Sequence, residues 1–274
     1  MGLFIQTNVS SMIAQSNLNK TSNGLSENFN KLSSGFRING AADDAAGLGI
    51  SKLMNASARS VIVASRNASD AISMSQTADG AAEQIHELLT RMRELAVQGA
   101  NGTNNTVDLA NLNGEFGSAS EEITRIGNVT TYNGTALLTG TASVAFQVGI
   151  QNTADDRITV SFGGASASNL GITAASLATI TGAQAAIGTL DSAISALSTV
   201  RRNFGSTINR LQSTVQNLSA TGTNLSSALS RMRDTDIAME TASLARNQVL
   251  TQAGAAVLGQ ANQAPQLALS LLRG

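Results

Sequence analysis

Apolar residues recur at intervals of seven in two long segments of the chain, which is the spacing of a coiled-coil seam. In the later segment the repeating residues are Leu190, Leu197, Phe204, Leu211, Leu218, Leu225, Met232 and Met239. In the earlier segment they are mostly smaller, namely Met54, Val61, Ala68, Ser75, Ala82, Leu89 and Ala96. Such a repeat places one apolar stripe along a helix, and a second helix has to cover it. The pattern predicts two long helices in a rod-like coiled-coil bundle, with the positions from Leu190 to Leu225 as the bundle seam.

Both ends of the chain carry shorter amphipathic patterns. Near the N-terminus Leu18, Leu25 and Leu32 recur at seven, and Phe29 is expected on the same face. Near the C-terminus the apolar residues step by three and four, as Leu250, Ala253, Val257, Ala261, Ala264, Ala268 and Leu271. Helices of this kind are marginal alone, so we expect the first ~40 residues to pair with the last ~40. The candidate packing and assembly residues are Leu18, Leu25, Phe29, Leu32, Leu250, Val257, Ala261 and Leu271.

The middle of the chain departs from this helical pattern. A loop is predicted at 101–105 and a helix from about Val107 to Gly127. The pair Asn133-Gly134 is a turn signal, and the stretches 144–150 and 157–162 alternate as strands do. After Gly163-Gly164 the small Ala and Ser residues are expected to return the chain to helix.

The fold class is therefore mainly α, with long antiparallel helices and a small β-hairpin region at about 135–175. We predict two domains. Residues 1–43 and 232–274 would form a terminal helical domain, and residues 44–231 a helical bundle that carries the hairpin region.

Composition narrows the range of partners and compartments. Net charge is −1 and no basic stripe is present, which argues against a nucleic-acid partner. There is no cysteine, and Pro265 is the one proline. No basic leading region with a sustained apolar run marks a signal peptide, and no segment is apolar enough to predict membrane insertion. Residues 247–272 carry no charge but many Gln and Asn, which suits burial in a protein assembly.

The candidate chemical motifs are incomplete. His86 opens a His-Glu pair, but Thr90 stands where a metalloprotease needs its second histidine. Gly35 and Gly40 are spaced as in a phosphate-binding loop, without the Lys and Ser/Thr that would follow. Asp43-Asp44 and Asp155-Asp156 are better explained as a helix start and a hairpin turn. We predict no catalytic residue, no metal site and no cofactor.

Four separated stretches carry a family resemblance. They are QTNVSSMIAQSNLNK (6–20), KLSSGFRINGAADDAAGLGIS (31–51), LLTRMRELAVQGANGTNN (88–105) and QAGAAVLGQANQAPQLALSLLR (252–273). In this order they closely resemble bacterial flagellins. The resemblance covers nearly everything outside about 135–185, so the chain looks like a minimal flagellin that lacks the large outer domains.

The resemblance implies a function and a location. Flagellins polymerise into the extracellular filament used for swimming, with the two chain ends in the innermost helical layer. It implies export in an unfolded state through the flagellar type III apparatus, and a secretion chaperone that binds the C-terminal helix. Other implied partners are hook-associated and cap proteins.

The resemblance also singles out three residues of the bundle. Arg91, Leu95 and Glu115 match flagellin positions that an animal Toll-like receptor reads. From the residues alone they are an exposed Arg, a Leu at the seam edge and an ordinary helical Glu, with subunit packing as their normal role. Two alternative functions stay open: a hook–filament junction protein of the same superfamily, and a filament-borne enzyme with an inserted catalytic domain.

Overall fold

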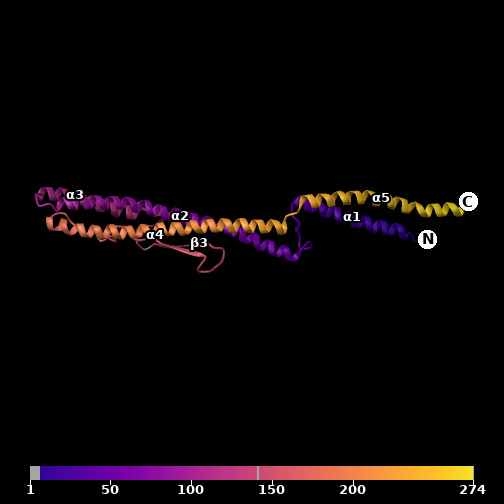
Figure 1. Cartoon of the computed structure of the whole chain (residues 1–274), viewed down its shortest axis with the longest axis horizontal. Helices are drawn as coiled ribbons and strands as arrows, with labels where there is room; N and C mark the ends of the chain where they lie inside the picture. The colour runs from indigo at the N-terminus through magenta and orange to yellow at the C-terminus, as the bar shows by residue number, and fades with distance from the viewer. Residues whose placement is uncertain (1–6, 141, 274) are drawn as a thin grey trace. The chain divides into compact units, whose positions relative to one another are not determined.

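The structure is a computed structural model that describes residues 7–140 and 142–273, with side chains described up to residue 263. Its helices are α1 (Val9–Ser34), α2 (Ala45–Gly99), α3 (Thr106–Val129), α4 (Ile180–Arg233) and α5 (Ile237–Arg273). Four short strands lie between α3 and α4. Figure 1 shows the five helices with the strands beside α4. The prediction of a mainly α fold with long helices and a small β region is confirmed.

The chain forms two compact units. One contains both chain ends, up to Ala56 and from Asn224 onward, and the other is Ser57–Thr223. Because α2 and α4 are long, each of them contributes to both units. The predicted domain boundaries at 43/44 and 231/232 stay a prediction.

Short polar side chains set the helix starts. Asn8 caps α1 by accepting a hydrogen bond from the Ser11 amide, and Asp236 accepts from the Ala238 and Met239 amides at the start of α5. In α3 Asn105 and Asp108 form a reciprocal capping box. These bonds satisfy amides that have no acceptor within the first helical turn.

Asp43 and Asp44 mark the start of α2, as the sequence predicted. Asp44 Oδ1 accepts from the Gly47 amide at 2.8 Å. Asp43 Oδ2 accepts from the amides of Gly40 (2.8 Å) and Asn39 (2.9 Å). Hydrogen bonds from Gly40 and then Asn39 to the ionised carboxylate lower the pKa of Asp43.

Two antiparallel hairpins form the β region, where the sequence predicted one. In the first, β1 (Thr131–Tyr132) pairs with β2 (Thr135–Ala136) around Asn133 (φ 46°) and Gly134 (φ 80°), the conformation that an Asn-Gly turn favours. In the second, β3 (Ser143–Gln147) pairs with β4 (Arg157–Ser161) from Ser143↔Ser161 to Gln147↔Arg157. The first hairpin starts before residue 135, where the predicted region began. Asp155 and Asp156 lie in the turn before β4, as predicted.

The expected return to helix directly after Gly163-Gly164 is wrong. The chain remains irregular until Ile180, and Gly171 adopts a positive φ of 71°. The physical reason is burial, because this stretch packs its small and apolar side chains into the core through a series of turns. These buried residues are Ala165, Ala167, Leu170, Ile172 and Leu177.

The seam of α4 lies in the core of the Ser57–Thr223 unit. Leu190, Leu197, Phe204, Leu211 and Leu218 are all buried, whereas Leu225 is half-buried and belongs to the other unit. Most of them share one apolar cluster with α2, with Phe116 and Ile123 of α3, and with the hairpin region. Phe162 and Phe204 contact each other with ring centroids 5.7 Å apart. The seam is therefore covered by three kinds of element, where the sequence predicted one partner helix.

We predict that Leu211→Ala lowers the free energy of unfolding of this unit by about 2–5 kcal/mol, because a fully buried Leu leaves a cavity. Urea denaturation of the full chain, followed by circular dichroism, measures the loss. Gln212→Ala is the matched control, since Gln212 is the exposed neighbour of Leu211 on the same helix. An unchanged transition midpoint for Leu211→Ala would contradict the burial.

Candidate assembly surfaces

The helices α1 and α5 form a pair that holds the two chain ends together (Figure 1). Near the termini Asn8 Nδ2 donates to the Ala261 carbonyl at 2.7 Å, and Ser11 Oγ donates to Asn262 Oδ1 at 2.7 Å. At the opposite end Phe36 forms an antiparallel bridge with Asp234. The described residues of α1 thus run antiparallel to α5.

The two linkers next to this pair are bound to each other. The Arg37 amide donates to the Arg233 carbonyl at 2.7 Å, and Arg37 Nη2 donates to the Met232 carbonyl at 2.6 Å. The Arg233 guanidinium stacks 3.8 Å from the centre of the Phe36 ring, a cation–π contact. Together these contacts fasten the start of α5 to the end of α1.

The inner face of the pair combines leucines with small and polar residues. On α1 the side chains that face α5 recur at steps of four and three: Ala14, Leu18, Thr21, Leu25, Asn28 and Leu32. Ala14 and Asn28 are the buried residues of α1, while the leucines are half-buried. On α5 the half-buried side chains are Glu240, Ser243, Leu244, Asn247, Thr251, Gly254, Leu258 and Ala261.

The outer faces of the pair carry large apolar side chains. Those that are about half exposed or more are Val9, Met12, Ile13, Phe29, Ile237, Met239, Val249, Leu250 and Val257. Exposed side chains of this kind occur on both helices of the pair. An apolar surface that stays exposed is a candidate for contact with another protein.

The structure therefore divides the eight candidate packing residues. Leu18, Leu25, Leu32 and Ala261 lie in the contact between α1 and α5. Phe29, expected on the leucine face of α1, is exposed instead, as are Leu250 and Val257 of α5. The sequence pattern on α5 followed Leu250 and Val257, but Asn247, Thr251 and Gly254 occupy the side that faces α1. The side chain of Leu271 lies outside the described residues.

Arg91 and Glu115 lie together on the surface of the other unit. Arg91 of α2 is bound to Glu115 of α3 at 2.8 Å and to Glu94 at 3.1 Å. The hydrogen bond with Glu115 is the main cause that raises the pKa of Arg91 above its ordinary value, and Glu94 adds to it. Leu95 is not part of this surface, since its side chain is only 1% exposed.

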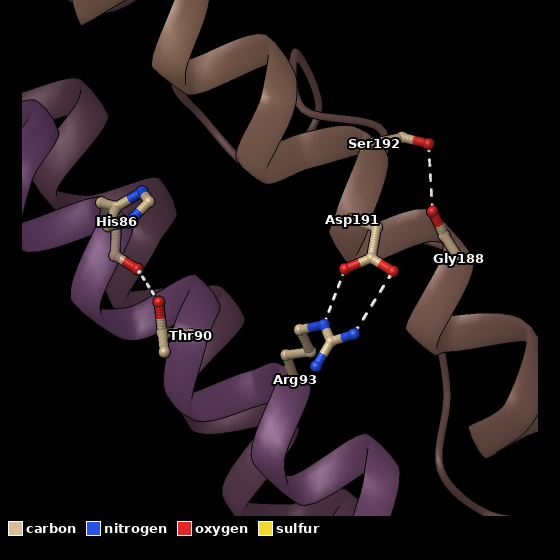
Figure 2. Close-up of polar contacts among 6 residues, drawn as sticks. All are labelled: His86, Thr90, Arg93, Gly188, Asp191 and Ser192. Atoms are coloured by element: carbon tan, nitrogen blue, oxygen red, sulfur yellow. Dashed lines mark hydrogen bonds and ion pairs between the residues drawn. The ribbon is translucent and has the colours of Figure 1, made fainter.

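Two further ion pairs connect α2 to α4. Figure 2 shows the Arg93 guanidinium turned toward both carboxylate oxygens of Asp191, with Nε donating to Oδ1 at 2.6 Å. Arg201 Nε donates to Asp79 Oδ1 at 3.0 Å, and its Nη2 lies 3.5 Å from Glu83. The second pair is more sheltered from solvent than the first.

His86 lies one turn before Thr90 on α2 (Figure 2). The Thr90 hydroxyl donates to the main-chain carbonyl of His86 at 2.9 Å, so this bond does not involve the His86 imidazole. Within the described residues there is no cluster of three or more His, Asp or Glu that could hold a metal ion. Among these same residues, no helix is both long and apolar enough to cross a membrane.

Sequence comparison places both ends of the chain in one family. The profile of the bacterial flagellin N-terminal helical region matches residues 5–143, and that of the bacterial flagellin C-terminal helical region matches residues 187–272. A flagellin of Halalkalibacterium halodurans is 43% identical over 272 residues, which cover 99% of this chain and all of the relative. The chain belongs to the bacterial flagellin family.

Two other relatives agree with this assignment. The flagellar filament 33 kDa core protein of Treponema phagedenis is 38% identical over 288 residues and is matched along 99% of this chain and its own full length. The crystal structure of Bacillus cereus flagellin superposes with a TM-score of 0.51 at 33% identity, covering 60% of this chain and 94% of that one. The match along the full length of two relatives fits a flagellin that lacks large outer domains.

Sequence reasoning missed the polar side chains at the centre of the terminal pair. Asn28 stands three residues after Leu25, at a position that continues the seam, but an amide in an apolar pattern gave no reason to single it out. It also missed the exposed Met12, Ile13 and Val249, which lie off the heptad positions. The signal available for Asn28 was its spacing, since Leu25, Asn28 and Leu32 are separated by three and four.

The pair of Arg93 and Asp191 predicts a dependence of stability on pH. The hydrogen bond from Arg93 is the main cause that lowers the pKa of Asp191 in the folded chain. Its contribution to stability is therefore present above the unfolded pKa of ~3.9 and is lost as pH falls through the folded pKa.

We expect Asp191→Asn to melt at a lower temperature than the wild type near neutral pH. The gap should close as the pH approaches about 2, where the wild-type carboxylate is protonated too. Thermal melts of both chains across this range measure the gap. A gap of constant size at every pH would show that the charge of Asp191 is not its cause.

Proposed function

We propose that this flagellin is the structural subunit of an extracellular bacterial flagellar filament and that subunits pack through the outer faces of the α1–α5 pair. The observation that carries the proposal is the incomplete burial of apolar side chains in this pair, because Val257, Leu250 and Phe29 are exposed while Asn28 occupies the contact. A helix pair that served a lone protein would bury its largest apolar side chains between the helices. Here those side chains are left for neighbouring subunits.

Burial at the outer faces supplies the driving force for polymerisation. Fully burying a large apolar side chain stabilises by roughly 1.5–3 kcal/mol. Several such groups on each helix therefore offer a substantial gain when neighbours cover them. The absence of charge from 247 to 272 supports the same role, because an unpaired charge in a subunit contact would be costly to desolvate.

Folding of the ends is coupled to assembly in this proposal. Ala14 and Asn28 are the buried residues on the α1 side of the pair, and its leucines are only half-buried, so pairing of α1 with α5 leaves apolar surface uncovered. Such a pair is loosely ordered in the monomer and becomes stable when neighbours cover its outer faces. The cost of ordering is then offset at the subunit contacts.

The partners proposed for the subunit follow from the family. We propose export in an unfolded state through the flagellar type III apparatus, which the absence of cysteine supports because no disulfide has to be broken. A secretion chaperone would bind the C-terminal helix before assembly, and its apolar residues Val249, Leu250 and Val257 are accessible for this in the monomer. Hook-associated and cap proteins would bind at the two ends of the filament.

An animal Toll-like receptor is a further proposed partner at Arg91 and Glu115. These two side chains are exposed and are held together by their ion pair, so they present a defined charged surface. Leu95 would support this surface from within the core, because its side chain is covered. The hook–filament junction alternative has no observation in its favour that a filament subunit lacks.

The first test concerns the outer face of α5. Val257→Asp places a charge at a side chain that is 55% exposed, so the subunit stays folded while the contact with neighbours has to desolvate a carboxylate. We expect seeded polymerisation, followed by electron microscopy, to stop with this variant. The matched control is Val257→Asn, because asparagine has the shape of aspartate without its charge. Filaments should elongate more readily with Val257→Asn than with Val257→Asp.

Ala261→Glu should also stop filament growth, but its effect is not specific to the contact with neighbouring subunits. Ala261 is half-buried in the α1–α5 contact and its carbonyl accepts from Asn8, so this change also disturbs the pair.

Filaments of normal length from Val257→Asp would refute the proposal that neighbouring subunits cover the outer face of α5.

The second test concerns order in the terminal helices. We expect the amides of residues 9–34 and 237–263 to exchange quickly in the monomer and slowly in the filament, because neighbours supply the burial that the pair lacks. Hydrogen exchange with mass spectrometry on both forms measures this, with the buried segment around Leu211 as an internal reference. Strong protection of both ends in the isolated monomer would overturn coupled folding.

A further inference from the structure

The centre of the α1–α5 contact is occupied by an amide. Asn28 is 6% exposed, which makes it more buried than any leucine of the described part of α1. It lies at a seam position, with Leu25 and Leu32 on either side at steps of three and four. A seam position in a helix pair ordinarily holds an apolar residue, and a buried polar group there has to find hydrogen-bond partners across the contact.

Asn28 finds these partners on both helices. With its amide oriented as the surrounding donors and acceptors require, Nδ2 donates to Glu240 Oε1 at 3.0 Å and to the Gly24 carbonyl at 2.9 Å. Its Oδ1 accepts from Asn247 Nδ2 at 3.2 Å, from Ser243 Oγ at 3.2 Å and from the Leu244 main-chain amide at 2.9 Å. One acceptor and three donors of α5, two of them on side chains, thus surround a single amide of α1.

We propose that Asn28 is the side chain within the α1–α5 contact that selects the register of the pair, in addition to the linker contacts of Phe36 and Arg37 with residues 232–234. The apolar residues of this contact cannot do so, because a helix pair that slides by seven residues puts its seam back in contact. An amide is different, since each of its groups needs a partner at one place and leaves a buried polar group unsatisfied elsewhere.

The sequence of α5 satisfies Asn28 in one register. After a slide of seven residues in one direction, the positions of Glu240, Ser243 and Asn247 would be taken by Asn247, Leu250 and Gly254. Leu250 and Gly254 have no side-chain hydrogen-bond donor, so the amide oxygen would lose both of its side-chain donors and keep only a main-chain amide.

A slide of seven residues in the other direction would bring Arg233 and Asp236 into these positions. Arg233 lies in α4, and Asp236 caps α5, so α5 would have to extend through its own start. Neither alternative register therefore reproduces the environment of Asn28.

Thr21 provides the contrast within the same helix. It occupies the same face one heptad before Asn28 and is also polar, but its hydroxyl donates to the Asn17 carbonyl of its own helix at 2.9 Å. A polar group that is satisfied within α1 carries no information about α5. The inference concerns pairing within one chain, so it does not depend on polymerisation.

Cysteine pairs can report the register, because the natural chain has no cysteine. A Cβ at Gly254 would lie 4.0 Å from the Leu18 Cβ, within the range of about 3.5–4.5 Å that disulfides adopt. Leu18→Cys with Gly254→Cys therefore reports the native register. Leu18→Cys with Ala261→Cys reports a slide by one heptad, since Ala261 follows Gly254 by seven.

Each reporter pair is placed in the full-length chain, oxidised briefly with copper phenanthroline, and scored for intramolecular disulfide by mass spectrometry. In the otherwise natural chain we expect the native reporter to cross-link at least about tenfold more than the shifted one. Asn28→Leu should reduce this ratio about tenfold, because both registers are then equally apolar. Asn28→Ala should act in the same direction with less change in packing.

Matched variants separate register from general stability. Thr21→Leu should leave the ratio unchanged, although it makes a comparable polar-to-apolar change on the same face. Glu240→Gln keeps an oxygen that accepts from Asn28 and should preserve the ratio, whereas Glu240→Leu should lower it. The proposal is overturned if Asn28→Leu and Asn28→Ala keep the natural ratio, or if Thr21→Leu lowers it equally. A chain that gives the expected ratios but forms no filament would count only against the proposed function.

Discussion

Several large apolar side chains of the terminal helices stay exposed in the single chain, although leucines of both helices share the contact between them. Asn28 and Asn247 occupy the contact between α1 and α5, and their hydrogen bonds keep that face of each helix turned inward. Val249 and Val257 are consequently turned outward. This constraint accounts for a helix pair that is incomplete alone, and it links the packing of one subunit to the presence of others.

The unit of residues 57–223 has the opposite character. Its seam leucines on α4, the small residues of α2 and the hairpin region share one buried cluster. Arg201 stands four residues after Leu197, at a seam spacing, and two carboxylates of α2 bind it. In the proposed assembly this unit is stable alone, while the terminal pair depends on neighbouring subunits.

The sequence predicted those parts of the structure that local periodicity determines. The seven-residue repeat located α4 and its buried residues, and Asn133-Gly134 located a tight turn. It could not predict the irregular cover between Gly163 and Ile180, because small Ala and Ser residues suit a helix as well as a packed series of turns. That choice depends on contacts with residues distant in sequence, such as the hydrogen bond from the Leu177 amide to Asn113 Oδ1 of α3.

The candidate site was predictable to a similar extent. The pattern identified the terminal helices as the assembly elements but assigned Leu250 and Val257 to the face that Asn247 and Thr251 occupy. Apolar periodicity indicates which face of a helix is favourable to bury, and it does not identify the partner that covers this face. In this chain polar groups such as Asn247 determine which face of α5 contacts α1. Their hydrogen bonds can be identified only when the positions of both helices are known.

The pairing of α1 with α5 also has a consequence for the synthesis of the chain, which proceeds from the N-terminus to the C-terminus. Asn8 and its acceptor Ala261 are separated by 253 positions, so the first helix to be made has its mate among the last residues. A chain that terminates early contains α1 but lacks the part of α5 that pairs with it, even when residues 57–223 are complete. Incomplete chains therefore lack the finished α1–α5 pair on which the proposed assembly depends.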